Sequence, residues 1–85
     1  MIGVQEATYI SQHKLWIKFN DGEEGVVDLS DIPERFRAAA PLKDEQVFAA
    51  FTLDEWPTLT WACGFDLAPE FIYERLTGNL PAWLN

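Results

Sequence analysis

Apolar and polar residues alternate along the first part of the chain, as they do in a strand with one buried face. In the segment 14–19 every second residue is large and apolar, and these residues are Leu15, Ile17 and Phe19. A short and moderately apolar segment, 4–10, precedes them. We therefore predict two antiparallel strands joined by a short turn.

A tight turn and a third strand are predicted next. Asp21 and Gly22 favour the turn, because an Asp-Gly pair tolerates positive φ angles at little cost. The segment 25–29 that follows is rich in valine and leucine, as strands are. Together the three segments predict an N-terminal three-stranded antiparallel meander.

Two prolines break the pattern over residues 30–41. Pro33 fits the first turn of a short helix, whereas Pro41 is expected to stop any helix after Ala40. We therefore expect a short helix or an irregular crossover in this segment.

A second helical turn is predicted over residues 45–50. Asp44 can cap its N-terminus by accepting a hydrogen bond from a backbone amide. The spacing of the apolar residues places Val47 and Phe48 on the core side.

A second β-hairpin is predicted from two short segments, 51–54 and 58–61, that are rich in threonine, leucine and aromatic residues. Residues 55–57 join these segments. Pro57 pushes the residue before it out of the helical region, which favours a turn there.

The sequence after this hairpin predicts a structural turn. Trp61 is expected to pack beneath the bend, and Gly64 provides the conformational freedom that the bend needs. Asp66 is expected to accept hydrogen bonds from amides of the turn or of the start of the next helix, which begins at Pro69.

The closing helix is predicted to span residues 69–77. Pro69 suits its first position, and Gly78 marks its C-terminal stop. Its buried stripe is expected to consist of Phe71, Ile72 and Leu76.

The tail, residues 79–85, is too apolar for an ordinary frayed end. It either packs back on the domain or adds to a partner. Trp83 and Leu84 are therefore candidate interaction residues.

The 85 residues suffice for one domain, 1–85, and not for two. Apolar residues make up 48% of the chain and aromatic residues 14%, which is enough for a packed core. The predicted fold class is α+β, with a three-stranded meander, a short helix, a second β-hairpin, a C-terminal helix and an apolar tail.

The chain carries 14 acidic and 6 basic residues, for a formal net charge of -8. A field of this sign repels phosphate backbones, so direct binding to DNA or RNA is not expected. The acidity either keeps the protein soluble or provides a face for a basic protein partner. No apolar stretch approaches the roughly 20 residues that span a bilayer, and a single cysteine fits a reducing cytoplasm.

Few residues offer catalytic chemistry. His13 is the only histidine and is expected to be an exposed turn residue, whereas Cys63 is expected to be a small buried residue rather than a reactive thiol. The acidic pairs 23–24 and 54–55 are expected in solvated turns, without the spacing of a calcium site. One cysteine and one histidine do not make a zinc set. We therefore expect no enzymatic activity, no metal and no cofactor.

Trp16 shares the polar face of its predicted strand with Lys14 and Lys18. This face is covered by the closing helix, or contacts another protein, or is exposed without a partner. The three residues are therefore candidate interaction residues.

Four motifs together resemble the small bacterial proteins of the family named domain of unknown function 2442. The motifs are Phe19-Asn20-Asp21-Gly22, the strand Val26–Leu29, the apolar segment around Phe48, and the segment Trp61–Tyr73. Ala62 and Cys63 stand where the family often has Pro-Asn. The resemblance implies an α+β domain with two hairpins and helices, and no established activity.

The resemblance also implies two kinds of role. Some members are similar to regulatory proteins in which a helix-turn-helix follows this domain, and others look like partners in toxin–antitoxin-like pairs. We expect no DNA-reading domain after Asn85.

Charge, tail and resemblance together favour a non-enzymatic protein-binding or regulatory module, with the acidic partner of a toxin–antitoxin-like pair as one form of it. The alternative is a self-associating structural domain that forms a homodimer. A third hypothesis is a small-ligand binder that uses an acidic pocket near Asp66.

Overall fold

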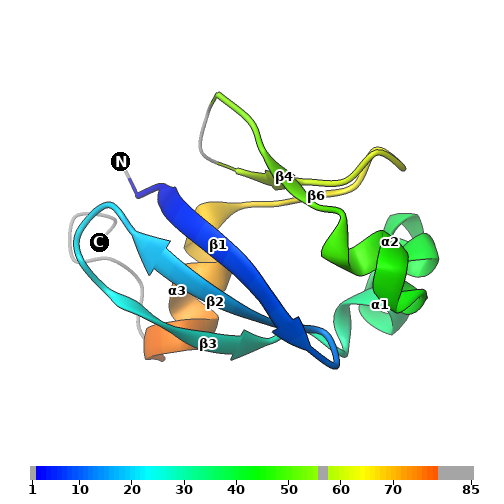
Figure 1. Cartoon of the computed structure of the whole chain (residues 1–85), viewed down its shortest axis with the longest axis horizontal. Helices are drawn as coiled ribbons and strands as arrows, with labels where there is room; N and C mark the ends of the chain where they lie inside the picture. Colours follow the sequence, from blue (N-terminus) through cyan, green and yellow to red (C-terminus); the bar gives the residue numbers. More distant parts are fainter. Residues whose placement is uncertain (1, 56–57, 79–85) are drawn as a thin grey trace.

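The three N-terminal segments form an antiparallel sheet with the strand order β1-β2-β3, as predicted (Figure 1). Its strands are β1 (Val4–Ser11), β2 (Lys14–Phe19) and β3 (Glu24–Asp28). The computed structural model describes residues 2–55 and 58–78.

Both turns of this sheet use left-handed backbone conformations. Gln12 and His13, between β1 and β2, have φ angles of 50° and 61°, and Gly22, between β2 and β3, has a φ angle of 95°. The turn predicted at Asp21 and Gly22 is therefore confirmed.

The segment after β3 contains α1 (Ile32–Arg35) and a 3₁₀-helix, η1 (Arg37–Lys43). The expected short helix is present, but the prediction that Pro41 stops the helix after Ala40 is wrong. Pro41 lies inside η1, which continues to Lys43. The fixed φ of proline is compatible with a 3₁₀-helix, and only one backbone donor is missing.

The second helical turn is α2 (Glu45–Ala49). The Asp44 side chain caps it by accepting a hydrogen bond from the Gln46 amide at 2.8 Å, as predicted. Phe48 is fully buried, but the prediction that Val47 faces the core is wrong, because Val47 is exposed. In a helix of little more than one turn, only Phe48 is fully covered by the core.

The second β-hairpin is confirmed and is extended by a third strand. β4 (Thr52–Leu53) pairs with β5 (Leu59–Thr60), and β5 pairs with β6 (Asp66–Leu67). The sequence pattern does not predict β6, because two residues are too few to show an alternation.

Between β5 and β6 the chain turns at Gly64, which has a φ angle of 97°. Trp61 is buried beneath this turn, and its indole Nε1 donates to the Phe48 carbonyl at 2.8 Å. The expectation that Asp66 caps the next helix is wrong. Asp66 lies in β6 with its side chain exposed to solvent, and the N-cap residue is Ala68, which has no side-chain acceptor.

The closing helix, α3 (Pro69–Thr77), has the predicted bounds. Gly78 caps its C-terminus in the left-handed conformation, with a φ angle of 80°. In the predicted stripe Ile72 is buried, whereas Phe71 and Leu76 are half-buried and packed against the core.

α3 packs against the inner face of the β1-β2-β3 sheet (Figure 1). The Tyr73 ring meets Phe19 of β2 edge-on, with 5.0 Å between the ring centroids. The Tyr73 hydroxyl donates to Asp21 at 2.7 Å, and this hydrogen bond raises the pKa of Tyr73 to about 12. Leu76 approaches Gly25 of β3 so closely that a Cβ atom there would lie 2.7 Å from the Leu76 side chain. The glycine therefore allows the helix to lie close to the sheet.

One hydrophobic core joins the two sheets and the helices, and the fold class is α+β as predicted. The largest fully buried side chains are Phe19, Phe48, Leu15, Ile17, Leu29, Ile32, Leu42, Leu59, Ile72 and Val4. Within the described ranges, no helix is both long and apolar enough to cross a bilayer. The predicted tail, 79–85, lies outside these ranges.

Candidate functional site

The outer face of the β1-β2-β3 sheet, on the side away from α3, carries a row of three side chains. Because β2 is the central strand, Trp16 has a neighbour on each side: Thr8 of β1 and Val26 of β3. We call this surface the Trp16 face. It consists of Glu6, Thr8, Ile10, Lys14, Trp16, Lys18, Glu24, Val26 and Asp28.

Charged residues lie on both sides of the row. The cross-strand pairs are Lys18 with Glu6 and Glu24, and Lys14 with Asp28. The pKa of Asp28 is lowered, first by hydrogen bonds from Ser30 and to a smaller extent by the charge of Lys14. Such opposite charges stabilise a sheet modestly and surround Trp16 with polar groups.

The apolar part of the Trp16 face is accessible to solvent. Val26 is 54% exposed, Ile10 is 50% exposed, and Trp16 is half-buried between its neighbours. The alternative in which the closing helix covers Trp16 is wrong, because α3 packs on the opposite face through Tyr73 and Leu76.

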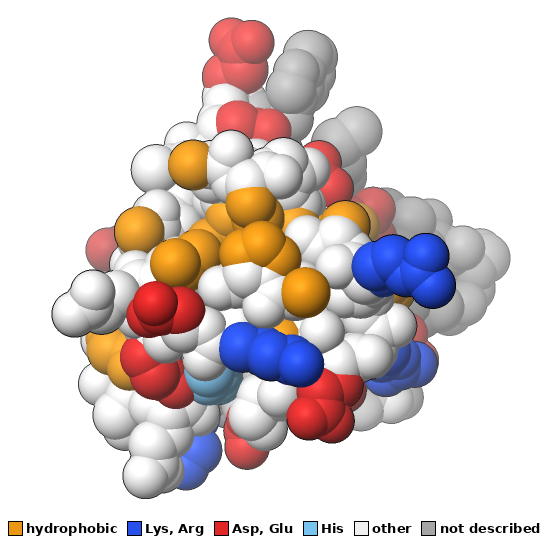
Figure 2. All heavy atoms as spheres, turned by 90° about the vertical axis from the view of Figure 1, so that its right-hand side faces the viewer, with side chains coloured by type: hydrophobic (Ala, Val, Ile, Leu, Met, Phe, Trp, Pro, Cys, Tyr) orange, Lys and Arg blue, Asp and Glu red, His pale blue; other side chains and the backbone are white. Residues whose placement is uncertain are grey.

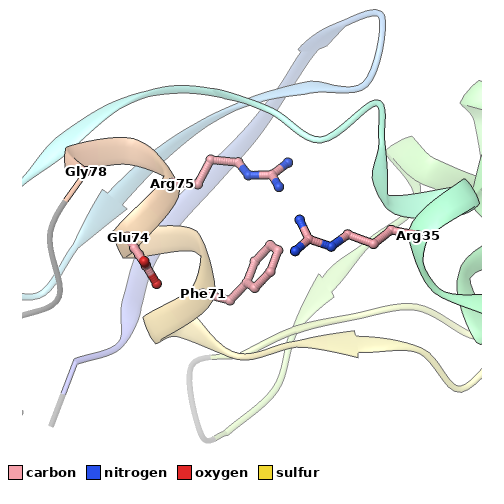
Figure 3. A pocket seen from close by; sticks show the side chains of 5 residues that line it. All are labelled: Arg35, Phe71, Glu74, Arg75 and Gly78. Carbon is pink, nitrogen blue, oxygen red and sulfur yellow. The ribbon is translucent and has the colours of Figure 1, made fainter.

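A groove of about 300 Å³ lies beside α3, between it and α1 (Figure 3). Its lining residues are Arg35, Phe71, Glu74, Arg75 and Gly78. The guanidinium groups of Arg35 and Arg75 lie over the Phe71 ring, 5.8 Å and 5.1 Å from its centroid. Each such cation–π contact contributes about 0.5–1 kcal/mol at an exposed site.

Acidic partners hold Arg75 in place. Its two terminal nitrogens donate to the two Asp31 carboxylate oxygens at 2.5 Å and 3.0 Å, and Nη1 also donates to the Asp28 carbonyl at 3.1 Å. Hydrogen bonding to Arg75 lowers the pKa of Asp31, and the same pairing raises the pKa of Arg75. Arg35 forms a longer ion pair with Asp31, at 3.7 Å. The shared carboxylate therefore compensates much of the positive charge in this groove.

His13 is not the exposed turn residue that the sequence predicts, because its side chain is only 14% exposed. Its Nδ1 contacts the Glu45 carboxylate, and its Nε2 lies 2.6 Å from the Leu42 carbonyl. Tyr9 donates to the same Glu45 carboxylate, and this bond raises the pKa of Tyr9 and lowers that of Glu45. The His13 ring also packs on Phe48, with 4.6 Å between centroids. This cluster joins the β1–β2 turn to α2.

Cys63 is exposed, so the prediction of a buried residue is wrong. It lies in the turn at Gly64, and its Sγ is 4.0 Å from the Ala38 carbonyl. The acidic pairs 23–24 and 54–55 are exposed, as predicted. Across residues 2–55 and 58–78, no group of three or more histidine, cysteine, aspartate or glutamate side chains is placed to hold a metal ion.

The end of the molecule that carries α1 and α2 shows a second group of hydrophobic side chains between charged ones (Figure 2). The exposed apolar residues of η1 and α2 are two alanines, a proline and Val47, which is 36% exposed. Small side chains provide less contact area than tryptophan does, so the Trp16 face is the better candidate for binding.

The structure brings Lys14, Trp16 and Lys18 together on one face, as their spacing predicts. Trp83 and Leu84 lie outside the described residues. Sequence reasoning missed Thr8, Val26 and Ile10 as members of this surface, because their positions depend on strand register. The turn lengths were the one signal that could have set this register. The pairing of Arg35 and Arg75 over one ring has no local sequence signal.

The sequence profile of the family described as protein of unknown function DUF2442 matches residues 4–78, so the chain belongs to this family. A crystal structure from Nitrosomonas europaea ATCC 19718, of a protein provisionally assigned as DNA-binding, is similar in fold, with a TM-score of 0.76 and 21% sequence identity. The similarity covers 92% of this chain and 50% of that one. No curated protein matches the sequence significantly.

Proposed function

We propose that this member of the DUF2442 family is a non-enzymatic protein-binding module that contacts its partner through the Trp16 face. The observation that supports this most is the row of Thr8, Trp16 and Val26, which is accessible to solvent on the side of the sheet away from the core. Tryptophan is enriched among the residues that dominate binding energy at protein interfaces, where polar residues form the rim. The charged pairs of the Trp16 face provide such a rim.

The proposed partner is a basic protein. Three acidic residues and two lysines belong to the Trp16 face, and the whole chain has a net charge of -8. Complementary charge speeds association and disfavours acidic competitors. In this proposal the chain is the acidic member of a toxin–antitoxin-like pair in the cytoplasm.

DNA binding is not the function that we propose. The assignment of the Nitrosomonas europaea protein concerns a chain of which this domain matches half, at 21% identity. Affinity for DNA comes largely from lysine and arginine side chains that neutralise phosphates, and this chain has an excess of acidic residues.

Native mass spectrometry of the tagged chain, purified gently from its own cells, tests the proposal. We expect a basic protein to co-purify at a fixed ratio, and the Trp16→Ala variant to lose it. The matched control is Val47→Ala, which removes an exposed apolar side chain from α2 and should retain the complex. Thermal unfolding checks that both variants are folded.

Two results would contradict the proposal. One is a basic partner that Trp16→Ala retains at the same ratio. The other is a wild-type chain that is isolated only as a monomer or as a homodimer, and the homodimer would favour the self-association hypothesis instead.

A further inference from the structure

β3 is an edge strand whose pairing with β2 is regular. Phe19 donates to the Glu23 carbonyl just before β3, and Leu29 donates to the His13 carbonyl just after it, both at 2.8 Å. In an antiparallel pair alternate residues bond to the neighbouring strand, so the odd-numbered residues of β3 bond to β2. The even-numbered residues turn their backbone N–H and C=O groups away from β2. They are Glu24, Val26 and Asp28.

Among residues 2–55 and 58–78, few groups contact the outward backbone groups of β3. Arg75 donates to the Asp28 carbonyl, whereas no described residue hydrogen bonds to the outward groups of Glu24 or Val26. Unpaired edge groups of this kind are a template for an added strand.

The other edge of the sheet is less suitable. β1 shifts its register to β2 between Val4 and Glu6 and again between Tyr9 and Ser11. Irregularities of this kind bend a strand and protect its edge from pairing. The register of β3 has no such shift over its five residues.

Charge decides what can pair with β3. An antiparallel pairing of two copies centred on Val26 would place Glu24 of each copy opposite Asp28 of the other. Like charges directly opposite are destabilising, so a second copy of this chain is disfavoured. A basic strand would instead place lysine or arginine opposite each acidic residue, with an apolar residue opposite the exposed Val26.

From this geometry we infer that an extended basic segment of a partner protein adds to β3 as a fourth strand. The inference rests on the proposed protein-binding function and names the part of the partner that binds. Side chains of the added strand that point to the outer face extend the Trp16 face. Those that point inward face the groove of Phe71 and Arg75, which adjoins this edge because Arg75 bonds to the Asp28 carbonyl (Figure 3).

The test uses a short capped peptide in which lysine, isoleucine and lysine alternate with threonine, and a second peptide with glutamate in place of lysine. Binding is followed by the NMR shifts and hydrogen exchange of the backbone amides. We expect the lysine peptide to slow exchange at Glu24 and Val26 and the glutamate peptide to have no effect. Contact with side chains alone would not protect these amides.

Val26→Pro removes the central outward donor, and proline is tolerated on edge strands where the N–H faces solvent. We expect it to weaken peptide binding about tenfold, which corresponds to about 1.4 kcal/mol. The matched control is Val26→Thr, which keeps the amide and should bind normally. If Val26→Pro does not fold, Glu24→Lys tests the same edge by reversing a charge. It should weaken binding of the lysine peptide to a similar extent.

Equal binding by the Val26→Pro and Val26→Thr variants, or amide protection outside β3, would overturn the inference. The native complex distinguishes failure of this inference from failure of the proposed function. A native complex that is lost in Trp16→Ala but retained in Val26→Pro would keep the Trp16 face and reject the added strand.

Discussion

The two faces of β2 differ sharply, although their residues alternate along one short strand. On the inner face Leu15, Ile17 and Phe19 are fully buried against α3 and the rest of the core. On the outer face Trp16 is half-buried, and the outer-face residues on either side of it along β2 are Lys14 and Lys18. The same alternation thus produces a packed surface and an accessible one.

This difference separates the residues that stabilise the fold from those of the proposed binding surface. Removing an inner side chain leaves a cavity, because the core is close-packed. Removing an outer side chain removes mainly cross-strand contacts, which contribute about 0.2–1 kcal/mol each. Substitutions on the outer face can therefore test the proposed binding while the protein remains folded.

Phe19→Ala should have the largest effect on stability. Phe19 is fully buried and its ring contacts Tyr73 of α3, so we expect a loss of about 3–5 kcal/mol in the free energy of unfolding. Urea unfolding followed by circular dichroism measures the change. A loss below about 1 kcal/mol would mean that the inner face is not the close-packed region described here.

Gly25→Ala should have an intermediate effect. The new Cβ would lie 2.7 Å from the tip of Leu76, and because this side chain can shift we expect a loss of about 1 kcal/mol. The double variant Gly25→Ala with Leu76→Ala should lose less free energy of unfolding than the two single variants lose in sum. Simple additivity in urea unfolding would rule out the close approach as the cause.

Trp16→Ala should destabilise the protein by no more than about 1 kcal/mol, because its contacts with Thr8 and Val26 are cross-strand pairs on an accessible face. The same urea measurement applies. A loss as large as that of Phe19→Ala would remove the distinction between the two faces and show that Trp16 belongs to a second core.

The Asp31–Arg75 pair, at the edge between the two faces, should give the smallest effect, visible only in acid. The pKa of Asp31 is lowered in the folded protein by hydrogen bonding to Arg75, below about 3.9 in the unfolded chain. The pair therefore stabilises the fold fully above that value, and this contribution is lost as the pH falls through the folded pKa.

Asp31→Asn should accordingly reduce the acid dependence of the melting temperature below about pH 4. The control, Glu34→Gln, changes an exposed carboxylate of α1, the helix that follows Asp31, and should reduce the acid dependence of the melting temperature less than Asp31→Asn does. An unchanged acid slope in Asp31→Asn would show that the pair does not contribute.

The elements with strong local signals could be predicted from the sequence. Pro69 and Gly78 set the ends of α3, and the alternation of β2 assigned each of its residues to the correct face. The tight turn at Gly22 was also predicted from a local signal, since an Asp-Gly pair favours positive φ.

Features that depend on contacts between distant segments could not be predicted. Val26 lies beside Trp16 because of strand register, and His13 is largely covered because it contacts Glu45, which lies far along the chain. Asp66 has the residue type of a helix cap, but pairing with β5 places it in a strand. Tertiary contacts decide such cases over local preference.

The most direct test of the central claim is hydroxyl-radical footprinting of the native complex compared with the free chain. It measures the oxidation of individual side chains, which falls when a partner covers them. The account predicts that oxidation of Trp16 and Val26 falls in the complex, whereas that of Val47, on α2, stays unchanged. Unchanged oxidation of Trp16 together with protection of Val47 would place the contact surface at the other end of the molecule and contradict the account.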